Sequence, residues 1–233
     1  MNASGKKLII AIDGPAGAGK STIASRLARK LGYLNLETGA MYRALALKAI
    51  ETDSSFDEED ALLELARSSR IELEPKLDGN RVLLDGMDVS ARVREADVSQ
   101  GASRVSVHPA VREWMVERQR ELGAGGGVVM EGRDVGTKIF PDADVKIFLD
   151  AAPHVRVARR LNQEQGATAS ALAAEISERD KRDRLRAASP LVPAADAVVL
   201  DTSNMSVGDV VGCIEEIISS TSQALPRRST DGN

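Results

Sequence analysis

The stretch from Leu8 to Thr22, LIIAIDGPAGAGKST, constrains the fold of this 233-residue chain more than any other. It begins with a short apolar run at 8–12 that holds three isoleucines, which is typical of a strand buried on both faces of a parallel sheet. Three glycines follow within six residues, and then Ile23, Leu27 and Leu31 recur at helical spacing. The stretch therefore predicts a strand, a glycine-rich loop and a helix.

The loop fits the Walker A pattern, Gly14-x-x-x-x-Gly19-Lys20-Ser21, in the strand-to-helix context that the pattern requires. Backbone N–H groups can wrap a polyphosphate only where no β-carbon obstructs it, and the following helix directs its free amides at the same anion. Lys20 adds a charge for the β- and γ-phosphates, and the Ser21 hydroxyl can ligate Mg²⁺. We predict a nucleotide-binding loop in preference to a turn that merely joins strand and helix.

Composition narrows the class of protein. The net charge of −4 and the pI near 5.4 argue against a general nucleic-acid binder. No apolar run approaches membrane-spanning length, and the first residues, MNASGKK, lack the apolar stretch of a secretory signal, so we expect a cytoplasmic protein without a membrane partner. The single cysteine, Cys213, excludes an intrachain disulfide, and two histidines disfavour a histidine-based metal or catalytic centre.

The rest of the chain predicts an α/β fold of the P-loop NTPase type. Strands are expected at 8–12, 33–36, 128–130, 145–149 and 197–200, separated by helices, which gives a five-stranded parallel sheet with helices on both faces. Between them, the alternation of apolar and acidic residues after Arg70 predicts a small antiparallel β insertion. We divide the chain into an N-terminal tail at 1–7, one domain at 8–218 and a disordered tail at 219–233. Within the domain we expect a core at 8–50, 123–160 and 187–218, an insertion region at 51–122 and a lid at 160–186.

The lid is the second informative segment. Residues 156–186 hold eight Arg or Lys and five Asp or Glu in a chain that is acidic as a whole. Arg179, Asp183 and Arg186 share one helix face, while Arg182 and Arg184 point elsewhere. A solvated, salt-bridged hairpin is the alternative, but beside a P-loop we favour a basic lid that closes over polyphosphate.

Polar residues also stand where predicted strands end. Glu131, Arg133 and Asp134 follow the strand at 128–130, where acidic groups could orient Mg²⁺ or its waters. Thr38 is the expected N-cap of a helix that carries Tyr42 and Arg43. The alternative for the segment after the strand at 128–130 is a polar strand end that only faces water. The alternative for Arg43 is a solvated helix charge.

Several motifs together resemble the bacterial cytidylate kinases: GPAGAGKST, ETGAMYR, EGRDVGT, FPDADVKIFLDA and ERDKRDRLRAASPLVPAADAVVLDTS, with the β insertion. The resemblance runs from about Leu8 to Ile218. It implies transfer of the γ-phosphoryl of Mg·ATP to CMP or dCMP by a nucleoside monophosphate kinase, expected to be a monomer without an obligate protein partner. The ATP phosphates would be bound by Gly14, Pro15, Ala16, Gly17, Ala18, Gly19, Lys20, Ser21 and Thr22.

The resemblance also implies roles for residues outside the P-loop. Ser21 would hold Mg²⁺, with Glu131 acting through water. The cytosine edge would be read by Ser103, Arg112 and Asp134. The rest of the acceptor and the transferred group would be bound by Thr38, Tyr42, Arg43, Arg133, Arg159, Arg160, Arg179, Asp183 and Arg186, with Lys20, Arg133, Arg159, Arg160 and Arg186 as the catalytic set.

The sequence departs from the family pattern at two positions, and two other functions remain as alternatives. Glu37 and Glu131 stand where many relatives have Asp, which lengthens the carboxylate. A P-loop kinase for UMP or for a non-nucleotide acceptor would share the core without needing Ser103, Arg112 and Asp134 together. A nucleotide-dependent switch or ATPase is the other alternative, although the chain has no Asn-Lys-x-Asp motif and a switch would leave the arginine-rich lid unexplained.

Overall fold

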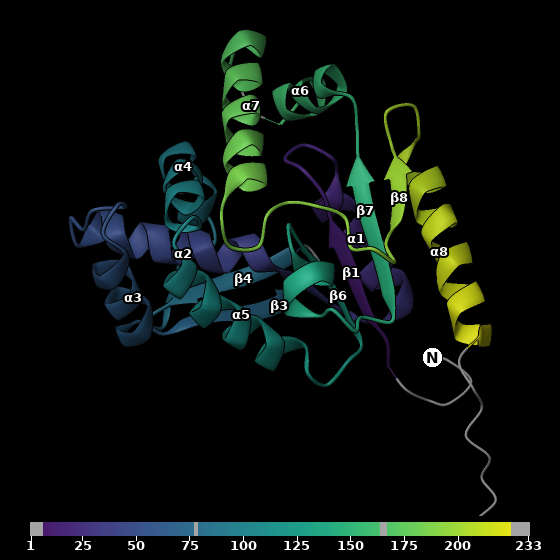
Figure 1. Cartoon of the computed structure of the whole chain (residues 1–233), viewed down its shortest axis with the longest axis horizontal. Helices are drawn as coiled ribbons and strands as arrows, with labels where there is room; N and C mark the ends of the chain where they lie inside the picture. The colour runs from purple at the N-terminus through teal and green to yellow at the C-terminus, as the bar shows by residue number, and fades with distance from the viewer. Residues whose placement is uncertain (1–6, 77–78, 164–166, 225–233) are drawn as a thin grey trace, which may run out of the picture.

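A computed structural model describes residues 7–76, 79–163 and 167–224. Its central sheet has five parallel strands in the order β2-β6-β1-β7-β8 (Figure 1). The predicted fold class is thereby confirmed, and each strand lies within two residues of its expected place. The strands are β1 (Ile9–Asp13), β2 (Leu34–Glu37), β6 (Val128–Gly132), β7 (Val145–Asp150) and β8 (Val198–Asp201).

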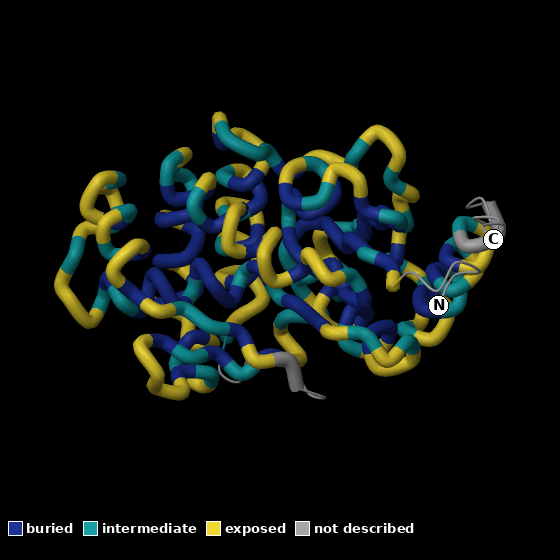
Figure 2. The backbone as a smooth tube through the Cα atoms, turned by 90° about the horizontal axis from the view of Figure 1, so that it is seen from below, coloured by how far each residue is buried: buried dark blue, intermediate teal, exposed yellow. Residues whose placement is uncertain are grey.

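Helices cover both faces of this sheet. On one face α1 (Lys20–Leu31) and α8 (Val207–Ala224) bury Leu27 and Ile214 against Ile10, Ile12 and the apolar residues of β7. On the other face α5 (Pro109–Gly123) and a π-helical turn (Val135–Ile139) pack against β2 and β6. Figure 2 shows buried backbone running through the middle of the molecule with exposed loops at its rim. Burial on both sides explains why β1, β6 and β7 read as nearly continuous apolar runs, whereas Val198 and Val199 of the edge strand β8 are exposed.

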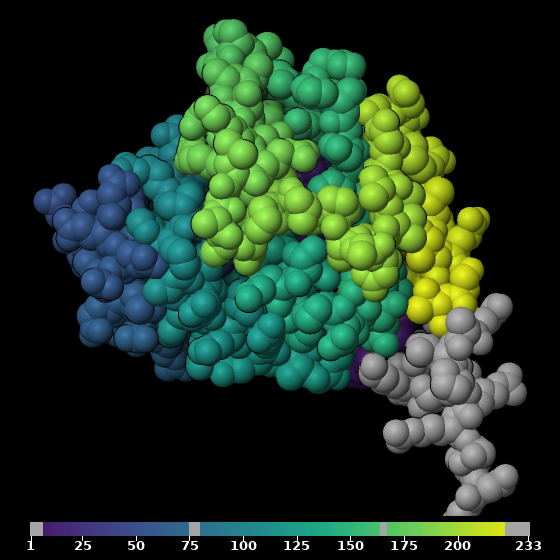
Figure 3. Space-filling model, viewed as in Figure 1, coloured from purple at the N-terminus to yellow at the C-terminus, as the bar shows by residue number. Residues whose placement is uncertain are grey.

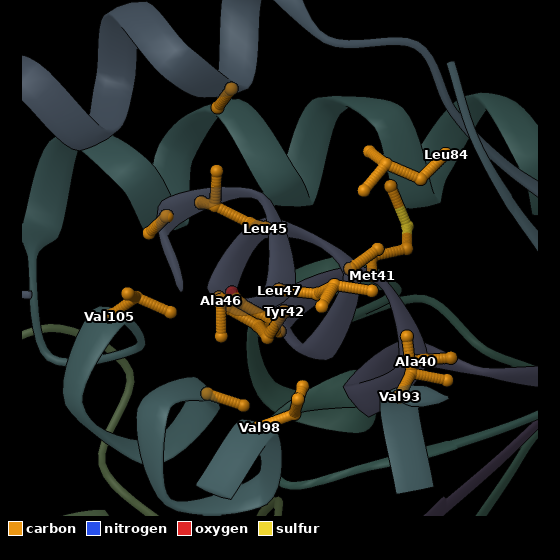
Figure 4. Packing of buried hydrophobic residues seen from close by; sticks show 14 of the residues in the cluster. Ala40, Met41, Tyr42, Leu45, Ala46, Leu47, Leu84, Val93, Val98 and Val105 are labelled. Carbon is orange, nitrogen blue, oxygen red and sulfur yellow. The ribbon is translucent and has the colours of Figure 1, made fainter. Parts of the chain in front are cut away.

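A second core lies beside the sheet and supports the insertion region. It is formed by α2 (Thr38–Glu51), α3 (Glu59–Ser68), α4 (Ala96–Val105) and α5, together with β3 (Ile71–Lys76) and β4 (Gly79–Leu84) of an antiparallel sheet whose third strand, β5 (Met87–Asp88), is exposed. Figure 4 shows Met41, Leu45 and Leu47 of α2 packing with Leu84, Val98 and Val105. The structure thus contains the predicted antiparallel insertion, and α2 is its central support.

The helical hairpin of the lid stands above the carboxyl ends of the parallel strands (Figure 1). It consists of α6 (Pro153–Leu161) and α7 (Ala169–Leu185), and the Thr168 side chain caps α7 by accepting a hydrogen bond from the Ala171 N–H at 3.3 Å. In Figure 3 atoms of the N-terminal part of the chain are visible in a small gap between this hairpin and the segment that follows it. The lid therefore lies over the P-loop edge of the sheet.

The expected end of the domain at residue 218 is wrong, because α8 continues to Ala224. Ser219, Ser220 and Thr221 donate hydroxyl hydrogen bonds to the carbonyls of Glu215, Glu216 and Ile217, at 2.9 Å each. These bonds satisfy the short polar side chains within the helix. The remainder of the predicted tail, 225–233, lies outside the described residues, as does most of the N-terminal tail. Within the described part of the chain no helix combines the length and apolar character needed to cross a bilayer.

Candidate active site

The P-loop leaves β1 and enters α1 through backbone that only glycine can adopt without strain. Gly19 precedes α1 with φ 94°, in the left-handed region. A β-carbon on Gly14 would lie 2.1 Å from the carbonyl oxygen of Leu149, so no side chain fits there. Strand β7 therefore packs directly against the start of the loop.

Lys20 is buried at the floor of this loop. Its Nζ donates to the carbonyl oxygen of Pro15 at 2.8 Å. Burial, reinforced by the positive charge of Arg133, lowers the pKa of Lys20 to about 7. The lysine thus sits in a pocket that already holds excess positive charge, and an anion bound here would stabilise its ammonium form.

Ser21 lies next to a buried carboxylate, Glu131. The Ser21 hydroxyl donates to Glu131 Oε1 at 2.5 Å, and Glu131 is buried at the end of β6. Burial, together with the nearby charge of Glu37, raises the pKa of Glu131. A carboxylate that is repelled by a second carboxylate, together with a hydroxyl oxygen beside it, forms a donor set that suits a hard divalent cation.

The expected role of Thr38 as an N-cap is wrong. Thr38 is the first residue of α2, and its hydroxyl donates instead to the carbonyl oxygen of Glu131 at 2.9 Å. Pairing of β2 with β6 brings that carbonyl within reach, and the bond satisfies a buried acceptor at the strand end. The Thr38 hydroxyl consequently links the start of α2 to the carboxyl end of β6.

Asn80 of β4 joins the insertion to the end of β2, and sequence reasoning missed it. Its Oδ1 accepts from the Glu37 N–H at 2.9 Å, and its Nδ2 donates to the Asn35 carbonyl at 2.6 Å. The amide thus pairs with β2 as a neighbouring strand would. It holds the backbone of Glu37, whose carboxylate binds Arg43 Nη2 at 2.6 Å. A lone Asn after a turn gives no signal of this role.

Asp13 was also missed, although it ends β1 immediately before the P-loop. Its two carboxylate oxygens accept the N–H groups of Val135 and Gly136 at 2.8 Å each, and the side chain is buried. It thereby fixes the loop that carries Arg133 and Asp134 against the start of the P-loop. An acidic residue that directly follows an apolar strand was the available signal.

We expect Asp13 to make stability depend on pH. Burial raises its pKa to about 6, although the two backbone hydrogen bonds lower it. Because the folded state binds this proton more tightly than the unfolded state, the contribution of Asp13 is largest below pH 4 and is lost as the pH rises through 6. Relative to Asp13→Asn, the free energy of unfolding of the unsubstituted protein should fall by about 2 kcal/mol between pH 4 and pH 7. Urea titrations of both proteins would measure this, and a constant difference would contradict it.

A central cleft opens beside Lys20 and gathers most of the predicted acceptor-site residues. Arg112 and Asp134 form a buried ion pair at 2.5 Å on one wall, and the Arg112 guanidinium also lies 5.5 Å from the ring centroid of Tyr42. Ser103 of α4 lines the same wall. The cleft is lined, among others, by Lys20, Ser21, Glu37, Thr38, Tyr42, Arg43, Ser103, Arg112, Glu131, Arg133, Asp134, Arg160, Arg179, Asp183 and Arg186.

A cluster of arginines around Asp183 lines the same cleft, and Arg186 Nη2 lies 4.0 Å from Asp134 Oδ1. Arg133 Nε donates to Asp183 Oδ2 at 2.8 Å, and Arg186 Nη1 lies 3.5 Å from Asp183 Oδ1. Burial alone would raise the pKa of Asp183, but Arg133 and Arg179 lower it. Burial and the charge of Arg133 lower the pKa of Arg179 to about 10. One carboxylate thus faces three guanidinium groups, which leaves the cleft electropositive.

Several buried polar atoms in this cleft have no hydrogen-bond partner among the described residues. They are Tyr42 Oη, Arg43 Nε, Arg112 Nε and Arg186 Nη2. Burying such groups without partners is costly, so their convergence on one cavity indicates a polar ligand. Three of the four are guanidinium donors, and this favours an anionic one.

A second, outer cleft lies on the other side of the P-loop, between α1, α6 and the start of α8. It is lined by residues 17–23 and by Arg159, Thr202, Met205 and Val207 among others, and Arg160 lines both clefts. Arg159 donates to the carbonyl oxygens of Ala18 at 3.2 Å and Thr202 at 2.7 Å. Arg160 therefore stands at the junction, whereas Arg159 ties the P-loop to the segment before α8.

Arg156 is a further residue that sequence reasoning did not single out. It lies on α6 and is buried between α7 and the P-loop, and its Nη1 donates to Asp180 Oδ2 at 2.6 Å and to the Ala16 carbonyl at 3.0 Å. Its position three residues before Arg159 was the available signal. Arg156 joins α6, α7 and the P-loop at one point.

Replacing Arg156 with methionine should destabilise the protein by about 3–5 kcal/mol, because Asp180 would stay buried without its cation. The lid would also lose its link to the P-loop, so KM for ATP should rise. Urea titration and steady-state kinetics would measure the two effects. The double variant Arg156→Met/Asp180→Leu is the control and should recover much of the stability. Equal stability of the single and double variants would contradict the expectation.

The fold and the two clefts define a class. The Walker A loop lines both clefts: the outer cleft can hold a nucleoside triphosphate, and the arginine-lined central cleft can hold a second anion. This is the arrangement of a P-loop phosphotransferase. The family model for cytidylate kinase matches residues 10–221. The chain belongs to the cytidylate kinase family, and it is a nucleoside monophosphate kinase.

Curated relatives agree over nearly the whole chain. The cytidylate kinase of Pelotomaculum thermopropionicum is 51% identical over 211 residues, which cover 88% of this chain and 93% of the relative. That of Geobacillus kaustophilus is 48% identical, with 91% and 97% covered, and that of Solibacter usitatus is 47% identical, with 92% and 94% covered. The resemblance expected from the motifs is thereby confirmed at the level of the family.

Proposed function

We propose that this chain transfers the γ-phosphoryl of Mg·ATP to CMP or dCMP, with ATP in the outer cleft and the acceptor in the central cleft. The observation that carries the proposal is the set of buried guanidinium and phenol atoms that lack a hydrogen-bond partner among the described residues and belong to side chains lining the same cleft as Lys20. The individual site residues, the cytoplasmic location and the monomeric state stay predictions.

The acceptor needs no general base. A phosphate monoester has its second pKa at about 6, so CMP is mostly a dianion at neutral pH. The obstacle is repulsion between two anions, and Lys20, Arg43, Arg133 and Arg186 would neutralise it. Closure of the lid excludes water that would otherwise take the phosphoryl group.

The oxygen donors beside the P-loop fit Mg²⁺. Ser21 would hold the cation directly, and Glu131, which accepts the Ser21 hydrogen bond, would hold it through water. When bound, Mg²⁺ neutralises charge on the β- and γ-phosphates. The longer Glu131 side chain reaches Ser21 in this structure, which supports the same assignment.

Recognition of cytosine would come from the buried Arg112–Asp134 pair. The exocyclic N4 group of cytosine is a donor that a carboxylate accepts, while its N3 and O2 accept from a guanidinium. Uracil presents an acceptor and a donor at the corresponding edge, so it would leave Asp134 facing an oxygen. The pair therefore favours cytosine over uracil.

The direct test is ADP formation from Mg·ATP with CMP, dCMP, UMP, AMP, GMP or water offered separately as acceptor. Turnover confined to CMP and dCMP is expected. Equal use of UMP would overturn the role of Arg112 and Asp134 and favour a broader pyrimidine kinase. ADP release with water alone would overturn the kinase assignment and favour the switch or ATPase alternative.

A further inference from the structure

Arg182 of α7 reaches across to α4 and contacts a residue of the central cleft. Its Nη1 donates to Ser103 Oγ at 2.9 Å. From its spacing Arg182 was expected to point away from the face shared by Arg179 and Asp183, and it does not line the cleft. It approaches Ser103 from outside instead, at the place where α7 stands beside α4 (Figure 1).

Arg182 and Ser103 differ in burial, and this difference indicates that Arg182 restrains Ser103 from the rim of the cleft. Ser103 is 5% exposed, whereas the side chain of Arg182 is 31% exposed at the rim. Arg182 also forms an ion pair with Glu178, which lies one turn back on the same helix at 3.5 Å and is largely exposed. A surface pair of that kind contributes little, so the bond to Ser103 is the contact that can matter.

A guanidinium can only donate, so Ser103 Oγ accepts from Arg182. That charge-assisted bond occupies one lone pair of the hydroxyl and restricts its rotamer. The second lone pair and the hydroxyl proton remain for a ligand in the cleft, next to Arg112 and Asp134. The orientation of the Ser103 hydroxyl, which we assign to the recognition of the acceptor base, therefore depends on the position of α7.

We propose that Arg182 is a positioning residue that couples the lid helix to the recognition of the acceptor base through Ser103. The inference rests on the proposed function, since it assigns Ser103 to the acceptor site. It predicts that loss of Arg182 weakens use of CMP while leaving use of ATP nearly unchanged. A residue that only stabilised the lid would affect both substrates.

The experiment compares steady-state kinetics of Arg182→Met, Arg182→Lys, Ser103→Ala and the double variant Arg182→Met/Ser103→Ala. Arg182→Met should raise KM for CMP on the order of tenfold, with KM for ATP changed by less than about twofold. Arg182→Lys, which keeps a charged donor, should recover part of the loss. The double variant should be no worse than Ser103→Ala, because Arg182 acts through that hydroxyl.

Arg184→Met is the matched control, since Arg184 is exposed two residues further along α7. It should leave both KM values unchanged. Additive effects in the double variant, a parallel rise of both KM values, or an unchanged KM for CMP in Arg182→Met would each overturn the inference. If the unsubstituted protein does not phosphorylate CMP, the proposed function fails first and the inference falls with it, so the two failures are distinguishable.

Discussion

Replacing Lys20 with methionine is expected to lower kcat/KM for Mg·ATP on the order of 10³-fold, because the variant lacks the charge that meets the β- and γ-phosphates. The fold should not suffer. Lys20 is buried among positive charges, and burial and Arg133 lower its pKa to about 7. Methionine fills similar space without that cost, so the free energy of unfolding should stay equal or rise.

The two readouts separate catalysis from folding. Steady-state kinetics measures the first, and urea titration of the same preparation measures the second. Lys181→Met is a suitable control, since Lys181 is an exposed lysine of the lid and should leave both quantities unchanged. A Lys20→Met variant that kept within tenfold of full activity would show that the P-loop does not bind the transferred phosphate as described.

Replacing Asp134 with asparagine should lower kcat/KM for CMP on the order of 10²-fold and narrow the preference for CMP over UMP. Asparagine keeps the shape of the side chain, but its amide can present a donor where cytosine also presents one. The substitution also removes the carboxylate that pairs with Arg112 at 2.5 Å. The Arg112 side chain, which is 3% exposed, would then be buried without a counter-charge from residue 134. Acceptor discrimination and stability should therefore both decline.

The comparison of CMP with UMP makes the result specific. A general loss of stability would reduce turnover of both acceptors equally, whereas loss of base recognition reduces CMP more. Asp142→Asn is the control, because Asp142 is an exposed carboxylate in the loop before β7. An unchanged ratio of CMP to UMP use in Asp134→Asn would contradict the assignment of Asp134 to the base.

Much of the site was predictable because its signals are local. The P-loop motif consists of nearly consecutive residues. The helical spacing of Arg179, Asp183 and Arg186 predicts that they share one face. The roles of Ser103 and Arg112, in contrast, came only from resemblance to a family, since neither has a distinctive local context. The structure brings both to the central cleft.

The residues that were missed share one property: their partners lie far along the chain. Asp13 binds amides 122 and 123 positions away, and Arg156 binds a carbonyl 140 positions away. Thr38 was assigned to a helix cap for the same reason, because its actual partner, the carbonyl of Glu131, is 93 positions distant. Strand pairing brings the groups around Asp13 and Thr38 together, and the packing of α6 against the P-loop does so for Arg156.

The sequence by itself determined the parallel sheet, the P-loop and the basic character of the lid, because buried strands, glycine-dependent backbone and charge density are properties of neighbouring residues. Only the tertiary structure decided how these parts meet. Strand order β2-β6-β1-β7-β8 sets Glu131 against Ser21, and the packing of α7 beside α4 places Arg182 on Ser103. Such contacts follow from the folding of the whole chain, since each one joins segments whose local patterns are independent of one another.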